Sequence, residues 1–324
     1  MSKPELPAEL RGALEAKLHG LSRDDIAARA AQISKTYRDG GNSRTIATSA
    51  DALAYALVRM PATYAALAAC LNALLEARPE FAPQSLLDVG AGPGTASWAA
   101  AETFASVQSF MLLDINVALQ TLALELGREH PRLAAMACRR DAAALDEVEP
   151  ADLVIASYLI GEVGENHRRS LAERLWTKTR DTLLVVEPGT PRGYAGIIAL
   201  RAQLIASGAH VAAPCPHDHP CPLHAPDWCH FAQRLPRLRA HLQLKGAELP
   251  FEDEKFSYVV LTREPAANRL SRVLAEPVVS KVEVAAKLCT NEGVELAKVA
   301  RRDKAGYAKA RRWHWGDALF RTRL

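Results

Sequence analysis

The sequence predicts an α/β fold built on a doubly wound, mostly parallel sheet. Short apolar runs recur between residues 85 and 262, stretches long enough for helices separate them, and the first run ends in the glycine-rich turn Gly90-Ala-Gly-Pro-Gly94. This alternation is typical of a parallel sheet with helices on both faces. We expect strands at 85–89, 110–113, 136–140, 152–156, 182–186 and 256–262.

Residues 1–80 lack any run that reads as a strand and are rich in Ala and Leu, so we expect helices there. One helix is predicted from about residue 21 to 37, with Ser22 as its N-cap. A second is predicted from about residue 51 to 77, and Pro61 is expected to end or kink it. The predicted units are a helical region at 1–80, an α/β domain at 81–263 with an insertion at 209–250, and a basic extension at 264–324. In this extension, residues 278–288 and 294–299 flank the turn Asn291-Glu-Gly293 and are expected to pair as an antiparallel β-hairpin.

The composition is that of a globular chain. Its 324 residues include 40 Lys+Arg against 37 Asp+Glu, a net charge of +3, and 49% of the residues are hydrophobic. No uninterrupted apolar run approaches the roughly 20 residues of a membrane span. The first residues show neither a signal-peptide core nor the Arg-rich character of a transit peptide. We therefore expect a cytoplasmic protein, whose six cysteines are reduced and either buried or bound to metal.

The glycine-rich turn is the first candidate site. Asp88, Gly90, Gly92 and Gly94 follow a strand and open a helix, and this spacing resembles the first motif of class I S-adenosylmethionine-dependent methyltransferases. The resemblance implies that the glycines lie against the methionine part of S-adenosylmethionine. It also implies that Asp114, at the end of the second strand, binds the ribose, and that Asp141 lies near the adenine. The alternative is a tight loop without a ligand.

The signals for catalysis are weak, and the sequence identifies no catalytic residue. The fourth strand is followed by Ser157-Tyr-Leu-Ile-Gly-Glu162, not by the Asn/Asp-Pro-Pro-Tyr of many nucleic-acid amino-methyltransferases. Tyr158 and Glu162 are either pocket residues or structural ones. Glu187, at the end of the fifth strand, either orients a substrate or caps a helix.

A cysteine-rich segment is the most specific feature of the chain. Cys215, Cys221 and Cys229 follow the spacing C-x5-C-x7-C among prolines and histidines. This spacing fits the close pairs of zinc sites poorly, whereas iron–sulfur ligation tolerates wider and uneven spacing. Cys289 is one candidate for the fourth ligand of such a cluster. A zinc site with a histidine remains the alternative, with His217, His219, His224 and His230 available, and Cys70 and Cys138 are expected in the core.

Taken together, these motifs resemble the methyltransferase-like assembly-factor family of the small ribosomal subunit, whose eukaryotic members act on mitochondrial ribosomes. The resemblance also includes Arg59-Met-Pro-Ala-Thr-Tyr64, Glu187 to Gly193 and Trp315-Gly-Asp317. It implies a methyltransferase fold, association with the small subunit and its rRNA, and a four-iron cluster on Cys215, Cys221, Cys229 and Cys289. The N-terminal sequence is that expected of a bacterial-type member.

Three functions remain open from the sequence. The chain is an assembly factor that uses the S-adenosylmethionine pocket and the cluster structurally, an active rRNA methyltransferase, or a small-molecule methyltransferase with a structural zinc site. The basic C-terminal segment favours an RNA partner, because Lys and Arg neutralise phosphates. Arg301, Arg302, Arg311 and Arg312 supply charge there, and Trp313 and Trp315 are candidates for stacking on bases.

Overall fold

The main sheet of the protein has the strand order expected of a doubly wound fold. The structure, a computed structural model, describes residues 2–140, 144–237 and 250–320. Within these residues the order is β3-β2-β1-β4-β5-β8-β6, and β7 pairs with β8. The strands are β1 (Ser85–Val89), β2 (Ser109–Leu113), β3 (Ala137–Arg139), β4 (Ala151–Ser157), β5 (Thr179–Pro188), β6 (His210–Ala213), β7 (Phe231–Pro236) and β8 (Phe251–Thr262). The six strands predicted from the sequence are confirmed.

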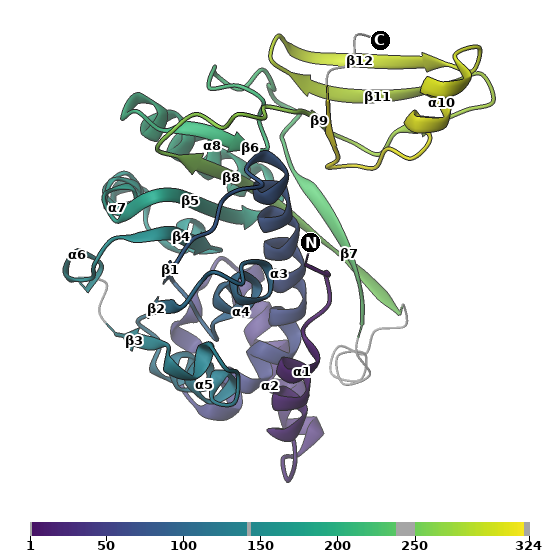
Figure 1. The fold of residues 1–324 in the computed structure, drawn as a ribbon. Helices are drawn as coiled ribbons and strands as arrows, with labels where there is room; N and C mark the ends of the chain where they lie inside the picture. The colour runs from purple at the N-terminus through teal and green to yellow at the C-terminus, as the bar shows by residue number, and fades with distance from the viewer. Residues whose placement is uncertain (1, 141–143, 238–249, 321–324) are drawn as a thin grey trace.

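Strands β1 to β5 are parallel, and β8 runs antiparallel to its neighbours β5, β6 and β7. The order reverses between β1 and β4, so the loops after these strands diverge and leave a crevice at their carboxyl ends. This is the class I S-adenosylmethionine methyltransferase fold, with one reversed strand near the edge (Figure 1).

Alternating side chains of the strands face two separate cores. Leu86 and Leu184 belong to the core under α3, whereas their neighbours Leu87 and Leu183 belong to the core on the opposite face. The period of two places successive side chains on opposite sides of the sheet. The helices that cover the sheet are α4 (Thr95–Thr103), α5 (Val117–Gly127), α6 (Ala144–Glu147), α7 (Glu165–Thr177) and α8 (Pro191–Ala206), with 3-10 turns η2 (Leu133–Ala135) and η3 (Ile160–Glu162).

The N-terminal region forms α1 (Ala8–Ala16), α2 (Arg23–Arg38), η1 (Ser43–Thr45) and α3 (Ser49–Ala77). Ser22 caps α2 as predicted, and Thr48 forms a capping box with Asp51 at the start of α3. Helix α3 packs against α4, α5 and β8 (Figure 1). Among the described residues, α3 is long and apolar enough to cross a membrane, but 83% of its apolar window is buried inside the protein. It is the central helix of the larger core.

Two outcomes were predicted for Pro61, an end of the second helix or a kink in it, and the first of these is wrong. Helix α3 continues through Pro61 to Ala77, a length of 29 residues. Proline removes one backbone donor from the helix. Nearly every residue around Pro61 is buried against other elements, so tertiary packing holds the helix together where its own hydrogen-bond ladder is interrupted.

The insertion predicted at 209–250 is partly built into the main sheet. Strands β6 and β7 flank the cysteine-rich segment, and both pair with β8. Strand β8 therefore begins at Phe251, five residues before the predicted start, because its first half is the partner of β7. We call residues 214–230, between these two strands, the cysteine loop.

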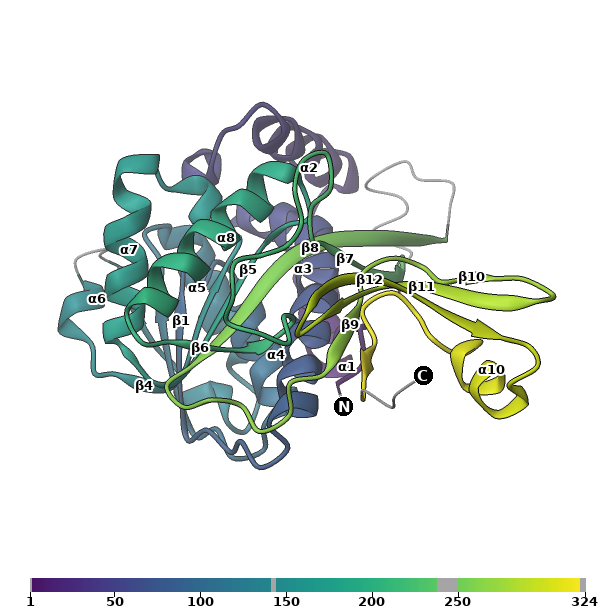
Figure 2. The ribbon, with the colours of Figure 1, turned by 90° about the horizontal axis from the view of Figure 1, so that it is seen from above.

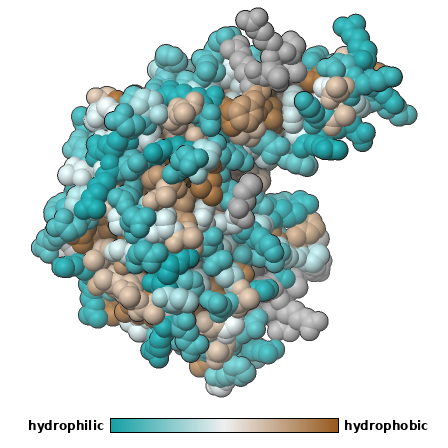
Figure 3. All heavy atoms as spheres, in the orientation of Figure 1, coloured by the Kyte–Doolittle hydropathy of each residue, from teal (hydrophilic) through white to brown (hydrophobic). Residues whose placement is uncertain are grey.

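The C-terminal residues form a second, smaller sheet that projects from the main body (Figures 1 and 2). It contains β9 (Ser271–Val273), β10 (Val278–Val279), β11 (Glu283–Thr290), β12 (Gly293–Ala300) and β13 (Ala318–Leu319), with α10 (Lys304–Ala310) beside it. The predicted β11–β12 hairpin is confirmed, but its first strand starts at Glu283, and Val278–Val279 is a separate strand paired with β11. The visible face of this unit is mainly hydrophilic (Figure 3).

Candidate functional site

The carboxyl ends of β1, β2 and β4 surround a pocket of about 370 Å³, the size of a small-molecule site. Gly90, Gly92 and Gly94 have φ angles of 71°, 54° and 80°, a backbone region that other residues rarely adopt. A Cβ at Gly90 would lie 2.9 Å from Leu159 Cδ1. The predicted glycine turn therefore requires glycine, and it brings bare backbone to the pocket wall.

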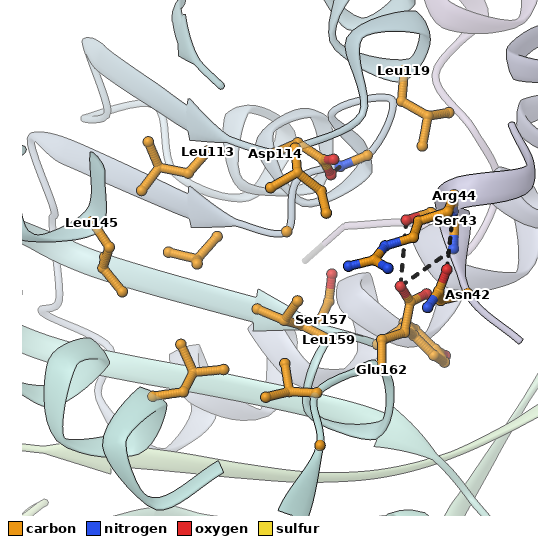
Figure 4. Close-up of a pocket in the computed structure, with 18 of the residues that line it drawn as sticks. Asn42, Ser43, Arg44, Leu113, Asp114, Leu119, Leu145, Ser157, Leu159 and Glu162 are labelled. Carbon is orange, nitrogen blue, oxygen red and sulfur yellow. Dashed lines mark hydrogen bonds between the residues drawn. The ribbon is translucent and has the colours of Figure 1, made fainter. Parts of the chain in front are cut away.

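Asp114 lies at the end of β2 and lines this pocket (Figure 4). Its carboxylate accepts hydrogen bonds from the backbone N–H of Gly92 (2.7 Å) and of Asn116 (2.7 Å). Burial raises its pKa, and these backbone donors oppose that rise. Each oxygen of this carboxylate keeps a further lone pair, so the two together can accept hydrogen bonds from two hydroxyl groups of a ligand. The second predicted ligand, Asp141, lies outside the described residues.

Asp88 lies beneath the glycine turn and is fully buried. Its Oδ2 accepts from Ser97 N (3.1 Å) and Ser97 Oγ (2.9 Å), which ties the start of α4 to β1. Within the described residues its Oδ1 has no hydrogen-bond partner. Desolvation by burial therefore raises the pKa of Asp88 to about 7.

A short segment of the N-terminal region closes one side of the pocket, which the sequence did not predict. Asn116 Nδ2 donates to the carbonyls of Ser43 and Ile46, both at 2.8 Å. Ser43 N and Oγ approach Glu162 Oε2 at 3.5 and 3.4 Å (Figure 4). The pocket wall thus combines the methyltransferase sheet with the helices before it. Tyr37, Tyr55 and Arg44 also line it.

The residues after β4 are held by structural contacts. Tyr158 has φ of 56°, and its hydroxyl donates to Glu254 Oε1 at 2.9 Å. Glu187 is buried and accepts from the N–H groups of Ile160 (2.7 Å) and Gly161 (3.1 Å) at the first residues of η3. Of the two alternatives for Glu187, these contacts favour the capping role. Tyr158 and Glu162 line the pocket, which agrees with the alternative that they are pocket residues.

The second candidate site joins the cysteine loop to the C-terminal sheet. The thiols of Cys215, Cys221, Cys229 and Cys289 are close enough that every pair of them interacts electrostatically. Burial raises the pKa of Cys215, Cys229 and Cys289, and the neighbouring thiols raise it further. Cys70 is fully buried in α3, and Cys138 is half-buried and packs against the same core. Both positions agree with the prediction that these two cysteines are core residues.

Polar contacts hold the cysteine loop in place from several sides. Tyr194 of α8 donates from its hydroxyl to Cys221 Sγ at 3.1 Å. Asp218 accepts from Val211 N (2.7 Å) and from Arg269 Nη2 (2.8 Å). Trp228 donates to the carbonyl of Gly189 at 3.0 Å. These contacts fix the loop against both α8 and the linker to the C-terminal sheet.

Among the described residues, no group of three or more His, Cys, Asp or Glu side chains has the arrangement of a single-ion site. Two histidines of the zinc alternative have other partners: His230 stacks on Trp228 with ring centroids 4.9 Å apart, and His217 Nδ1 approaches the carbonyl of His219 at 3.2 Å. Nearest to a thiol is His217 Nε2, 3.8 Å from Cys289 Sγ.

Comparison with known proteins identifies the family of the chain. The family model described as mitochondrial small ribosomal subunit Rsm22 matches residues 49–320. The chain belongs to the Rsm22 family. The sequence-based resemblance to methyltransferase-like assembly factors of the small ribosomal subunit is therefore confirmed.

Two kinds of relatives resemble this Rsm22-family chain. The human ribosome assembly protein METTL17, mitochondrial, is 29% identical over 290 residues, which cover 82% of this chain and 62% of the relative. The Rsm22-cox11 tandem protein 2, mitochondrial, of Schizosaccharomyces pombe is 23% identical over 95% of this chain and 48% of the relative. The chain thus spans about half to three fifths of the length of these relatives.

Solved methyltransferase structures resemble it more distantly. Magnesium protoporphyrin IX methyltransferase from Synechocystis, with bound S-adenosylmethionine, is 13% identical at a TM-score of 0.41, covering 76% of this chain and 99% of that chain. Precorrin-6y C5,15-methyltransferase from Geobacter metallireducens is 11% identical at a TM-score of 0.39, covering 59% and 85%.

The buried Asp88 predicts a dependence of stability on pH. Because its pKa in the folded protein is raised from 3.8 to about 7, folding is favoured by the protonated form. This contribution is fully present below the unfolded pKa and is lost as the pH rises through 7. We expect the free energy of unfolding in urea to fall by on the order of 2–4 kcal/mol between about pH 4 and about pH 8, and to fall less in Asp88→Asn. Equal pH slopes in the two proteins would contradict this assignment.

Proposed function

We propose that the chain is an assembly factor of the small ribosomal subunit that binds S-adenosylmethionine, holds one 4Fe-4S cluster and contacts rRNA. The observation that carries this proposal is the convergence of Cys215, Cys221, Cys229 and Cys289 at the junction of the two sheets. These four thiols come from a loop and from a strand sixty residues further along the chain. A metal bound between two such distant segments would stabilise the fold or a docking surface, and this role requires no catalysis.

The arrangement of the thiols favours a cluster over a single ion. In a four-iron cluster each thiolate binds a different iron, so the four sulfurs stand farther apart than around one zinc ion. The four thiols here interact in every pair, and the spacing of Cys215, Cys221 and Cys229 along the chain fits the close pairs of zinc sites poorly. When bound, a cluster supplies iron–thiolate bonds that cross-link the loop to β11. We place the chain in the cytoplasm, where reducing conditions keep such thiols available.

The pocket supports binding of S-adenosylmethionine by the residues that the sequence indicated. Gly90 and Gly92 bring backbone to the pocket and Asp114 presents its carboxylate there, whereas Gly94 and the fully buried Asp88 do not line it. When bound, S-adenosylmethionine supplies an activated methyl group. Tyr158 and Glu162, two polar side chains that line the pocket, are engaged by Glu254 and Ser43. This favours a binding role over methyl transfer to rRNA or to a small molecule.

RNA contact is the third part of the proposal, and the structure limits which residues supply it. Arg311 and Arg312 follow α10 and are exposed. Trp313 packs against the small core of the C-terminal sheet, and Trp315 donates to the carbonyl of His230 at 2.9 Å. Both tryptophans are half-buried and have partners within the protein, so we assign the phosphate contacts to the exposed arginines.

The first test is calorimetry of S-adenosylmethionine binding. Asp114→Ala is expected to weaken binding about tenfold or more, because it removes a charged hydrogen-bond acceptor from a half-enclosed site. Asp253→Ala, which removes an exposed carboxylate paired with Arg234, serves as the control and is expected to bind as the wild type does. No binding by the wild type at millimolar ligand would exclude the pocket as a cofactor site, and measurable methyl transfer to rRNA would replace the assembly role with an enzymatic one.

The second test compares Cys289→Ser with Cys70→Ser after anaerobic purification. Loss of one ligand is expected to remove most of the iron and sulfide and to expose residues 210–235 to protease, since the metal tethers both segments. Cys70 is fully buried in α3 and is not one of the four predicted ligands, so its variant is expected to keep both properties. Full iron in Cys289→Ser would show that the fourth ligand is another residue, and one zinc without sulfide in the wild type would establish the zinc alternative.

The third test measures the affinity for small-subunit rRNA as a function of salt. Replacing Arg311 and Arg312 by Ala is expected to weaken binding and to lower the slope of log affinity against log salt by roughly 1–2. The matched control replaces Lys35 and Arg38, two exposed residues of α2. Unchanged affinity and slope in the first variant would mean that this segment is an ordinary solvated surface.

A further inference from the structure

Two buried guanidinium groups from different parts of the fold lie close to the four thiols. Arg201 of α8 is 2% exposed, and Arg272 of β9 is 4% exposed. Arg201 forms a side-chain hydrogen bond with Cys215, and the charges of both arginines act on Cys215 and Cys289. Arg272 stands beside Cys289 in the β9–β11 register and also acts on Cys229. One charge thus comes from the main body and one from the C-terminal sheet.

The positions of the two side chains are fixed by the backbone around them. Arg201 Nη2 donates to the carbonyl of His217 at 2.7 Å, inside the cysteine loop. Arg272 Nη1 donates to the carbonyl of Gly316 at 2.8 Å. Tyr194, whose hydroxyl binds Cys221, precedes Arg201 by two turns on α8 and therefore lies on the same helix face. This face of α8 is directed at the loop.

Burying these charges without a counter-ion would be costly. Arg272 Nη1 lies 3.6 Å from Glu76 Oε2, so it has one carboxylate neighbour. Among the described residues Arg201 has no carboxylate within ion-pair distance, and its Nε is buried without a hydrogen-bond partner. An uncompensated buried charge costs several kcal/mol. The surroundings of the thiols are therefore complementary to an anion.

We propose that Arg201 and Arg272 are positioning residues whose charges balance an anionic four-thiolate metal centre at Cys215, Cys221, Cys229 and Cys289. This inference rests on the proposed metal site but does not depend on its metal. Four thiolates around a divalent zinc ion, or around the usual oxidised four-iron core, carry two net negative charges. Two guanidinium groups match that charge, so the centre and the arginines neutralise each other away from water.

The role of a counter-ion differs from a packing role in its measurable effects. Partners around the ligands of a metal site commonly change metal affinity by about 10–100-fold when they are mutated. Removing a positive charge beside a redox centre also disfavours the reduced, more negative form, and so lowers the reduction potential. A residue that only fills space would change neither quantity once the protein is folded.

The experiment uses the full-length protein purified without air. Arg201→Met removes the charge and keeps the length of the side chain, and Arg201→Lys keeps the charge. Arg263→Met is the matched control, because Arg263 is a half-buried arginine that stacks 3.8 Å from the Trp176 ring centroid, away from the thiols. Iron, sulfide and zinc per chain, the rate of metal release to a chelator, the reduction potential and the thermal midpoint are measured for each protein.

We expect Arg201→Met to release metal about tenfold faster and to show a more negative potential, with Arg201→Lys close to the wild type and Arg263→Met changed only in its thermal midpoint. Equal release rates and potentials in Arg201→Met and the wild type would overturn the inference, as would a lysine variant that behaves like the methionine variant. A wild type without metal would instead refute the metal site itself. If Arg201→Met does not fold, Arg272→Met, which removes the second of the two charges, is measured in its place with the same expected result.

Discussion

The burial of charge where the two sheets meet is the constraint on which the organisation of this chain depends. Arg201 from α8 and Arg272 from β9 are both withdrawn from water beside the thiols. Arg201 donates to the carbonyl of His217 in the cysteine loop and Arg272 donates to that of Gly316 beside the C-terminal sheet. These hydrogen bonds and the buried setting of both charges depend on the loop and the sheet keeping their positions. Electrostatic interactions of the buried arginines therefore help to fix the relative position of the two sheets, together with hydrophobic packing.

The same junction connects to the cofactor pocket through short segments of the main sheet. Glu187 at the end of β5 holds η3, whose Glu162 contacts Ser43 at the pocket wall. Two residues beyond Glu187, the carbonyl of Gly189 accepts from Trp228 in the cysteine loop. Both sites thus share the segment after β5, which lies where parallel sheets of this fold gather their ligands.

Most of the fold could be predicted from the sequence because its strands are short, apolar and bounded by turns. Residues 85–89 and 152–156 were identified within one residue of the observed strands. Pro61 misled the prediction because local propensity says nothing of the packing that surrounds a buried helix. Strand β10 was merged with β11 because the residues between them, including Val282, continue the apolar pattern while Ser280 turns the chain.

The candidate sites were predictable where their residues form a motif with a recognisable spacing along the sequence. The glycine turn and the cysteines have such patterns, whereas Arg201, Arg272 and Asn116 act through distant partners that no local motif reveals. Trp313 and Trp315 were singled out because they are aromatic residues next to arginines, and the fold shows that both are half-buried, with packing and hydrogen-bond partners inside the protein. A side chain's environment decides between these roles, and that environment is a property of the folded chain.

The order of the cysteines along the chain has a consequence for biosynthesis. Cys215, Cys221 and Cys229 are translated well before Cys289, which is sixty residues further on. At bacterial-to-eukaryotic elongation rates of about 5–20 residues per second, the interval is roughly 3–12 s. During that time the nascent chain offers three thiols and lacks β11, so any metal it takes up has an open coordination position. The four-thiol site closes only when the C-terminal sheet has been made, which makes its completion a late event in the life of each new molecule.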